Sequence, residues 1–366
     1  MAPVAGGPCW PPVKPLASAL PLGCVALVLT LTLASLARAT EAPVAPPAPA
    51  ATRAAFLQLI ARDRVPPAAE LKSAAEADGV VTVPFTYATE AGERVPGLLL
   101  KKSGSTGRRP VIIALHGTGG KKEDMLADLR RAAGAGFIGV AIDGRFHGAR
   151  APTGKAAYPD AILRAWQTGR GHPFFYDTVW DVMRLIDWLE TREDVDAKRV
   201  GLFGISKGGI ETYLAAAADP RIAVAVPCIG LESFRWALEH DAWQSRIGTI
   251  QAPFDAAAKE AGVTAPGAEF VGRFYDRVAP GLAGQFDGPA MVRLIAPRPL
   301  LAINGDSDAR TPLPGLEECA AAARPAYAAA GVPEQFQLRL QPHTGHQVTA
   351  ESHQAALDWF VRWLKP

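Results

Sequence analysis

Cysteine is scarce in this sequence, with four residues in 366. Two of them, Cys9 and Cys24, lie near the amino terminus, which leaves Cys228 and Cys319 for the rest of the chain. A small domain held together by many disulfides is therefore excluded, and no cluster of thiolates is available for a metal. We expect two buried free thiols, with one disulfide between Cys228 and Cys319 as the alternative.

An excess of charge of either sign is also absent. The formal net charge is +2, and residues 1–39 hold Lys14 and Arg38 but no acidic residue. Their removal leaves 36 of the 38 basic side chains against 36 acidic ones. Without a basic field we expect no nucleic-acid partner. The 49% of hydrophobic residues is sufficient for one large α/β domain.

The longest apolar run lies close to the amino terminus. It is centred on residues 25–33, follows Lys14 and ends in Ala-Arg-Ala at residues 37–39, the small-x-small pattern of a cleavage site. This pattern predicts a signal peptide over residues 1–39, cleaved near Ala39, with export to the periplasm or medium and no stable membrane span afterwards. An uncleaved membrane anchor is the alternative. An Ala/Pro-rich linker over residues 40–52 and one globular domain over residues 53–366 are expected to follow.

Apolar runs that alternate with helix-like segments predict a mostly parallel sheet with helices on both faces. Helices are expected at residues 53–64, 68–77, 175–190 and 350–364. Strands are expected at residues 80–87, 95–101, 111–115, 137–142, 199–203, 222–226, 300–303 and 336–340. Residues 229–298 contain helical stretches and no clear strand, which predicts a helical cap insertion above the strands or an insertion with only a packing role. Residues 145–172 form a second long connection, expected to border the same site.

The most informative motif is Gly-Ile-Ser-Lys-Gly at residues 204–208. It follows an apolar strand and opens a helix-prone run, the context in which G-x-S-x-G forms a nucleophile elbow. A nucleophilic serine must stand on a sharp, strained turn, and Gly204 and Gly208 remove the Cβ atoms that would collide there. We therefore predict that Ser206 is a nucleophile. The alternative is a glycine-rich loop with an ordinary serine.

Acyl transfer also needs a base and an acid that orients it, each in a loop after a strand. His346 follows the last predicted strand and is the expected base, with His343 as the alternative. Asp306 and Asp308 both follow the preceding strand, and the residues themselves leave the choice of acid open. The chain order Ser, Asp, His is that of α/β-hydrolases.

Oxyanion donors are expected from His-Gly-Thr-Gly-Gly at residues 116–120, directly after a buried strand. One donor should be the N–H of Lys207, the residue after the nucleophile, and the other that of Thr118 or Gly119. A phosphate-binding loop is the alternative, and it is rejected because Lys122 stands where serine or threonine is required. No metal site is expected, since the spacing of the histidines suits no familiar set of ligands.

The chain from about residue 80 to residue 366 resembles the α/β-hydrolase superfamily, and within it the dienelactone-hydrolase and acetyl-xylan-esterase-like branch. The similar motifs are the elbow at residues 204–208, the loop at 116–120, the acid loop at 305–312 and the histidine loop at 345–346. The resemblance selects Asp308 over Asp306 as the acid. It also implies that Asp, Arg and His of residues 143–148 are structural or line the pocket, so His147 is kept out of the triad.

Together these features predict an exported serine hydrolase with the α/β-hydrolase fold that cleaves carboxylic esters through an acyl-enzyme. Ser206 would attack the ester, His346 would transfer the proton, and Asp308 would orient His346. The expected substrate is a small-molecule or carbohydrate-linked ester, with no cofactor. The alternatives are a prolyl-oligopeptidase-like serine peptidase and a catalytically silent binding module. Two roles are open for the Lys207 ammonium: pairing with Glu211, or contact with an anionic group of the substrate.

Overall fold

The computed structural model describes residues 48–366, so the predicted signal peptide over residues 1–39 lies outside the described residues. Most of the predicted linker lies outside them as well. Among the described residues, no helix combines the length and the apolar character needed to cross a bilayer.

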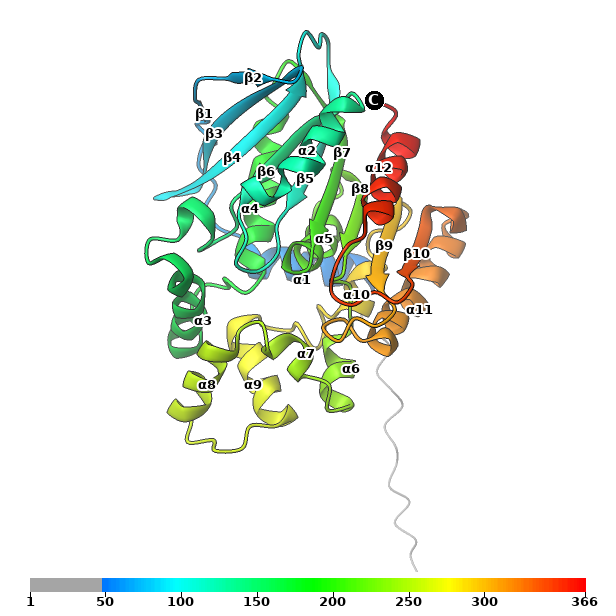
Figure 1. The fold of residues 1–366 in the computed structure, drawn as a ribbon. Coiled ribbons are helices and arrows are strands. Elements are labelled where there is room, and N and C mark those ends of the chain that lie inside the picture. The colour runs from blue at the N-terminus through cyan, green and yellow to red at the C-terminus, as the bar shows by residue number, and fades with distance from the viewer. Residues whose placement is uncertain (1–47) are drawn as a thin grey trace, which may run out of the picture. The chain divides into compact units, whose positions relative to one another are not determined.

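The described residues build one ten-stranded sheet with the order β1-β3-β4-β6-β5-β7-β8-β9-β10, in which β2 also pairs with β3 (Figure 1). The first strands pair antiparallel: β1 Glu70–Leu71, β2 Ala75–Ala77, β3 Val80–Glu90 and β4 Glu93–Lys102. The six others run parallel: β5 Arg109–Leu115, β6 Ile138–Ile142, β7 Val195–Ile205, β8 Ile222–Cys228, β9 Leu300–Gly305 and β10 Phe336–Gln341. The predicted mostly parallel sheet is confirmed.

Helices cover both faces of this sheet, because its central strands are apolar on both sides. In β5, Val111 and Ile113 belong to one buried cluster, whereas Ile112 and Ala114 belong to the other. The first cluster is covered by α1 Pro49–Ile60, α4 Tyr176–Leu189, α5 Lys207–Ala218, α10 Gly288–Val292 and α11 Leu313–Ala329. The second is covered by α2 Leu126–Gly134 and α12 Ala350–Leu364.

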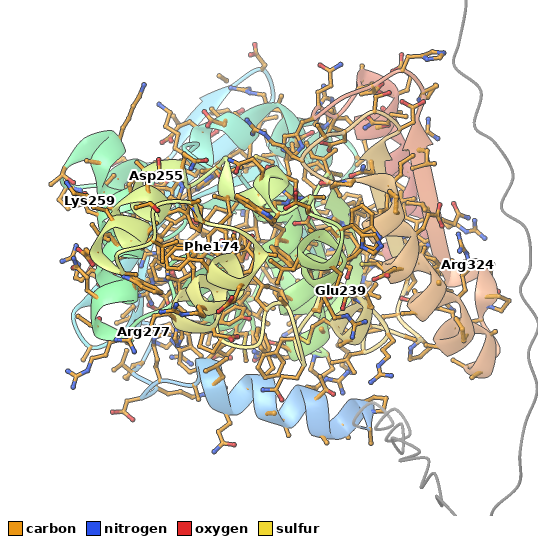
Figure 2. The ribbon with its side chains drawn as sticks, turned by 90° about the horizontal axis from the view of Figure 1, so that it is seen from below. Phe174, Glu239, Asp255, Lys259, Arg277 and Arg324 are labelled. Carbon is orange, nitrogen blue, oxygen red and sulfur yellow. The ribbon has the colours of Figure 1, made fainter. Side chains whose placement is uncertain are left out.

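Every element between β8 and β9 is a helix, and most of these helices lie beyond the carboxyl ends of the parallel strands (Figure 1). They are α6 Phe234–Glu239, α7 Gln244–Ile247, α8 Gln251–Glu260, α9 Ala268–Val278 and α10. We refer to α6–α9 as the cap. Helix α3, Ala157–Thr168, packs against α8 and α9 and so extends the cap. Viewed from the cap side, Asp255, Lys259 and Arg277 lie outward on α8 and α9, and Phe174 lies inside (Figure 2).

Four short helices of the described residues lie in loops: η1 Lys122–Met125, η2 Gly148–Arg150, η3 Gly154–Ala156 and η4 Pro333–Gln335.

Two expectations near the start of the domain are wrong. The first helix spans Pro49–Ile60 rather than residues 53–64, so the linker cannot extend to residue 52; a proline in the first turn starts this helix. Residues 68–77 contain the strands β1 and β2 instead of a helix, because pairing with β3 overrides their helical propensity.

Candidate active site

Ser206 occupies the sharp turn between β7 and α5. Its backbone angles are φ 58° and ψ −115°, a conformation that costs a non-glycine residue about 1–3 kcal/mol. The turn is held by its neighbours: the Ser206 N–H donates to the carbonyl of Cys228 at 2.9 Å, and its carbonyl accepts from Ile210 at 3.0 Å. A Cβ on Gly208 would lie 2.3 Å from the carbonyl oxygen of Leu115, so only glycine fits there. The motif is thus folded as a strained strand–turn–helix.

His346 lies between Ser206 and Asp308. Its Nε2 is 2.8 Å from Ser206 Oγ, and its Nδ1 is 2.8 Å from Asp308 Oδ2 and 3.0 Å from Oδ1. Since a carboxylate can only accept, Nδ1–H donates to Asp308, which leaves Nε2 as the acceptor for the serine hydroxyl. The three residues come from the loops after β7, β9 and β10, and His343 is exposed.

The carboxylate of Asp308 is buried and well supplied with donors. Besides His346, the N–H groups of Arg310 and Thr311 donate to its Oδ1 at 2.8 and 3.3 Å. Burial by itself would raise the pKa of Asp308, but the hydrogen bond and charge of His346 and the Arg310 N–H outweigh it and hold the pKa below its ordinary value. Asp308 therefore remains an anion at neutral pH.

Asp306 has a different place in the same loop. Its carboxylate accepts the backbone N–H of His343 at 2.9 Å and that of Thr344 at 3.2 Å. These hydrogen bonds, led by the one from His343, lower the pKa of Asp306. Asp306 therefore ties the acid loop to the histidine loop, while Asp308 contacts the imidazole.

The loop at residues 116–120 passes close to Ser206. A Cβ on Gly117 would lie 3.6 Å from the Cβ of Ser206, and Thr118 and Gly119, which follow, are exposed. On the other side, Lys207 is the first residue of α5, and the first N–H groups of a helix have no partner within it. The loop at residues 116–120 and the first turn of α5 thus both lie beside Ser206.

His116 fixes the start of that loop. Its Nδ1–H donates to the carbonyl of Gly117 at 2.8 Å, and its Nε2 accepts the N–H of Gly144 at 3.0 Å. Burial, together with the nearby charge of Lys207, lowers the pKa of His116 to about 4. A neutral imidazole therefore connects the loop after β5 to the loop after β6.

The side chain of Lys207 points away from solvent. It is 1% exposed, forms an ion pair with Glu211 one turn along α5, and has its Nζ 5.6 Å from the centre of the Tyr158 ring. The hypothesis that its ammonium meets an anionic group of the substrate is wrong, because the pair with Glu211 is buried. The structural pairing is the observed arrangement.

A pocket of about 720 Å³ opens beside the loop at residues 116–120. Its walls include Thr118, Gly119, Phe146, His147, Tyr158 and Thr249. The connection at residues 145–172 therefore lines this pocket, and Thr249 brings the cap to it. His147 donates through Nδ1 to the carbonyl of Arg145 at 2.7 Å, and burial and the charge of Lys207 lower its pKa to about 2. It forms a neutral part of the wall, apart from Ser206, His346 and Asp308.

Asp143 connects the segment after β5 to the segment after β6, a contact that the sequence motifs do not predict. Its Oδ1 accepts the N–H of Lys122 at 2.8 Å, and its Oδ2 accepts the Lys122 ammonium at 2.9 Å and the N–H of Ala149 at 2.9 Å. The sequence signal for Asp143 was its position directly after a predicted strand.

The sequence contains no signal for a buried ion pair between Arg246 of the cap and Glu232 of the segment after β8, because neither residue belongs to a recognisable motif.

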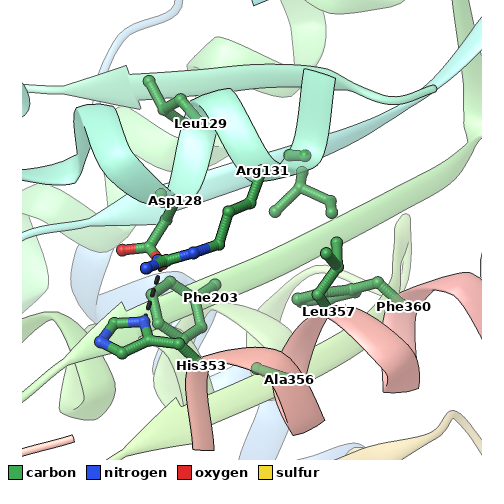
Figure 3. Close-up of a pocket in the computed structure, with 11 residues that line it drawn as sticks. Asp128, Leu129, Arg131, Phe203, His353, Ala356, Leu357 and Phe360 are labelled. Carbon is green, nitrogen blue, oxygen red and sulfur yellow. Dashed lines mark hydrogen bonds and ion pairs between the residues drawn. The ribbon is translucent and has the colours of Figure 1, made fainter. Parts of the chain in front are cut away.

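A second cavity, of about 20 Å³, lies between α2 and α12, on the face of the sheet that these two helices cover (Figure 3). There His353 Nδ1 is 2.7 Å from Asp128 Oδ1, beside the ring of Phe203. This cavity is too small for an ester substrate. Within residues 48–366, no group of three His, Cys, Asp or Glu side chains is arranged to hold a metal ion. Cys228 and Cys319 are buried free thiols, as expected.

The chain matches two esterase families. The acetyl xylan esterase (AXE1) family matches residues 58–243, and the fungal glucuronyl esterase family matches residues 174–331. Together these matches include the loop at residues 116–120, the turn at Ser206, the cap and the loop that carries Asp308.

Individual relatives are similar over different shares of the chain. The YtaP protein of Bacillus subtilis (strain 168) is 24% identical over 318 residues, 82% of this chain and 94% of the relative. The 4-O-methyl-glucuronoyl methylesterase 1 of Sodiomyces alcalophilus is 30% identical over 176 residues, 46% of this chain and only 34% of the relative. The solved acetyl xylan esterase 1 of Thermoanaerobacterium sp. JW/SL YS485 superposes with a TM-score of 0.62 at 19% identity, covering 87% of this chain and 94% of that structure. This last likeness confirms the predicted fold.

Proposed function

The chain belongs to the acetyl xylan esterase (AXE1) family of carboxylic-ester hydrolases, and from that premise we propose that it is an exported serine esterase with Ser206, His346 and Asp308 as its catalytic triad. The observation that supports this triad is the continuous line of hydrogen bonds from Ser206 Oγ through both ring nitrogens of His346 to Asp308. Spacing and tautomer both suit transfer of the serine proton to Nε2.

The reaction proceeds in two stages. Ser206 Oγ attacks the ester carbonyl while His346 Nε2 takes its proton, and the carbonyl oxygen becomes an oxyanion. The N–H groups of Lys207 and of Thr118 or Gly119 stabilise that oxyanion. His346 then protonates the leaving alcohol as the C–O bond breaks, which leaves an acyl group on Ser206. Water, deprotonated by His346, attacks this acyl-enzyme and releases the acid and free Ser206.

Asp308 stays ionised through both stages. It holds Nδ1–H in place, so that Nε2 is free to accept a proton, and it stabilises the imidazolium that forms after each transfer. The carboxylate can do this at neutral pH because its hydrogen bonds keep its pKa low. No cofactor takes part in these steps.

The substrate we propose is a small-molecule or carbohydrate-linked ester. The pocket of about 720 Å³ has space for a group much larger than acetyl. Its walls present the hydroxyl of Thr118 and, as an acceptor, that of Thr249, whose proton is donated to the carbonyl of Arg246. Two of the relatives named above are a glucuronoyl methylesterase and an acetyl xylan esterase, which favours a sugar as one part of the ester. Export, proposed from the apolar run at residues 25–33, would place the enzyme where polysaccharide fragments occur.

A panel of substrates tests this function. Mature protein should hydrolyse p-nitrophenyl esters and acetylated xylo-oligosaccharides, and should leave an aminoacyl-p-nitroanilide intact. Ser206→Ala should abolish ester turnover while the far-UV circular dichroism and melting temperature remain those of a folded protein. Cleavage of the anilide faster than any ester would identify a peptidase instead, and no turnover of any compound would favour a silent binding module.

A further inference from the structure

A buried arginine of the cap reaches the loop that carries Asp308. Arg246 in α7 is 3% exposed and forms an ion pair through its Nε with Glu232, which is 1% exposed. Its Nη2 donates a hydrogen bond of 2.5 Å to the hydroxyl of Thr311. One guanidinium therefore joins the segment after β8, the cap and the acid loop.

Thr311 is in turn one of the groups that hold Asp308. It is fully buried, its N–H lies 3.3 Å from Asp308 Oδ1, and its carbonyl accepts the side-chain amide of Asn304 at 3.2 Å. The backbone of Thr311 cannot shift without moving a donor to the Asp308 carboxylate. Arg246 is thus connected to Asp308 through a single residue.

The same piece of the cap reaches the pocket. Thr249, which lines the pocket, donates its N–H at 3.0 Å and its hydroxyl at 2.8 Å to the carbonyl of Arg246. The pocket wall, Arg246 and the acid loop therefore form one continuous set of contacts.

We propose, on the premise of the function above, that Arg246 is a positioning residue that acts through Thr311 to fix the Asp308 carboxylate against His346. Glu232 neutralises the guanidinium, which would otherwise be a costly buried charge, and orients its second nitrogen toward Thr311. The cap therefore sets the reaction rate as well as shaping the pocket.

The first test changes only the hydroxyl of Thr311. Thr311→Val keeps the volume of the side chain but removes the acceptor for Arg246. We expect kcat to fall about tenfold with KM unchanged, near the upper end of what the net contribution of one hydrogen bond can supply. Thr311→Ser restores the hydroxyl and should restore kcat. A role in packing alone would give the reverse order, because serine lacks the methyl group.

The second test removes the ion pair as a unit. Arg246→Met combined with Glu232→Gln leaves no unpaired buried charge, so the fold should be retained. It should lower kcat as much as Thr311→Val, with no further loss when the three changes are combined, because both remove the same connection. Arg277→Met is the matched control. This second cap arginine donates to the carbonyls of Trp166 and Gln167 rather than to the acid loop, and its loss should leave kcat unchanged.

These kinetics separate the proposal from the function on which it rests. An active wild type in which Thr311→Val keeps its kcat overturns the role of Arg246 alone, as do fully additive losses in the combined variant. A tenfold loss in Arg277→Met would also overturn it, since any loosening of the cap would then suffice. An inactive wild type overturns the proposed function together with this role.

Discussion

Replacement of Asp308 by asparagine should stop the reaction without unfolding the protein. The N–H groups of Arg310 and Thr311 both donate to Oδ1, so the amide oxygen of asparagine should take that place. Its NH₂ group then occupies the position of Oδ2, 2.8 Å from His346 Nδ1. A donor there forces the imidazole into the tautomer with hydrogen on Nε2, which cannot accept the proton of Ser206.

The size of this effect follows from the tautomer. In a serine protease the same change lowers kcat about 10⁴-fold, which is about 5 kcal/mol of activation free energy. We expect a loss of this order for Asp308→Asn, measured by steady-state hydrolysis of a p-nitrophenyl ester, with a melting temperature close to that of the wild type.

Asp306→Asn is the matched control, since Asp306 lies in the same loop and contacts only backbone N–H groups and Ser307. It should lower the melting temperature slightly and change kcat little. If the large rate loss instead follows Asp306, or if Asp308→Asn keeps a tenth of the activity, the assignment of the acid is refuted.

Three further outcomes are expected. The pKa of His147 is about 2 in the folded protein, below the ordinary 6.5, so only the unfolded chain binds this proton as the pH falls. Wild type should therefore lose about 2 kcal/mol of unfolding free energy relative to His147→Gln between pH 7 and pH 5, measured by urea titration; equal pH dependence would contradict this. Lys207→Met leaves Glu211 buried and unpaired, so it should cost about 3–5 kcal/mol in the same assay and lower the rates for anionic and neutral esters alike. A rate loss confined to anionic esters would instead indicate that the Lys207 ammonium contacts the substrate. Intact mass of protein from the native host should place the amino terminus at or near Thr40; an intact Met1 on soluble protein would refute export.

The parallel part of the sheet was predictable because its strands are buried on both faces and read as continuous apolar runs. Residues 111–115 and 222–226 are examples, and each matches a strand of the structure closely. Residues 68–77 were predicted incorrectly, because an alanine-rich segment with high helical propensity pairs with β3, and local patterns do not reveal such a partner. Helix α11 was not predicted either.

The site was predictable where the fold itself imposes a position. Ser206, Asp308 and His346 each follow a strand of the parallel sheet, and the structure brings them within hydrogen-bonding distance. The buried Lys207 ammonium lies 5.6 Å from the ring of Tyr158, which belongs to a connection whose path no motif specifies. For the same reason Arg246 gave no signal, since only the folded cap places it beside the acid loop.

Labelling by a fluorophosphonate tests the central claim most directly, because this reagent reacts with a serine only when a base activates it. Mature protein should gain one phosphonyl group, and peptide mass spectrometry should locate it on Ser206. His346→Ala should slow the labelling strongly, and Ser206→Ala should abolish it. Labelling of another residue, or equal labelling of the Ser206→Ala variant, would contradict the account.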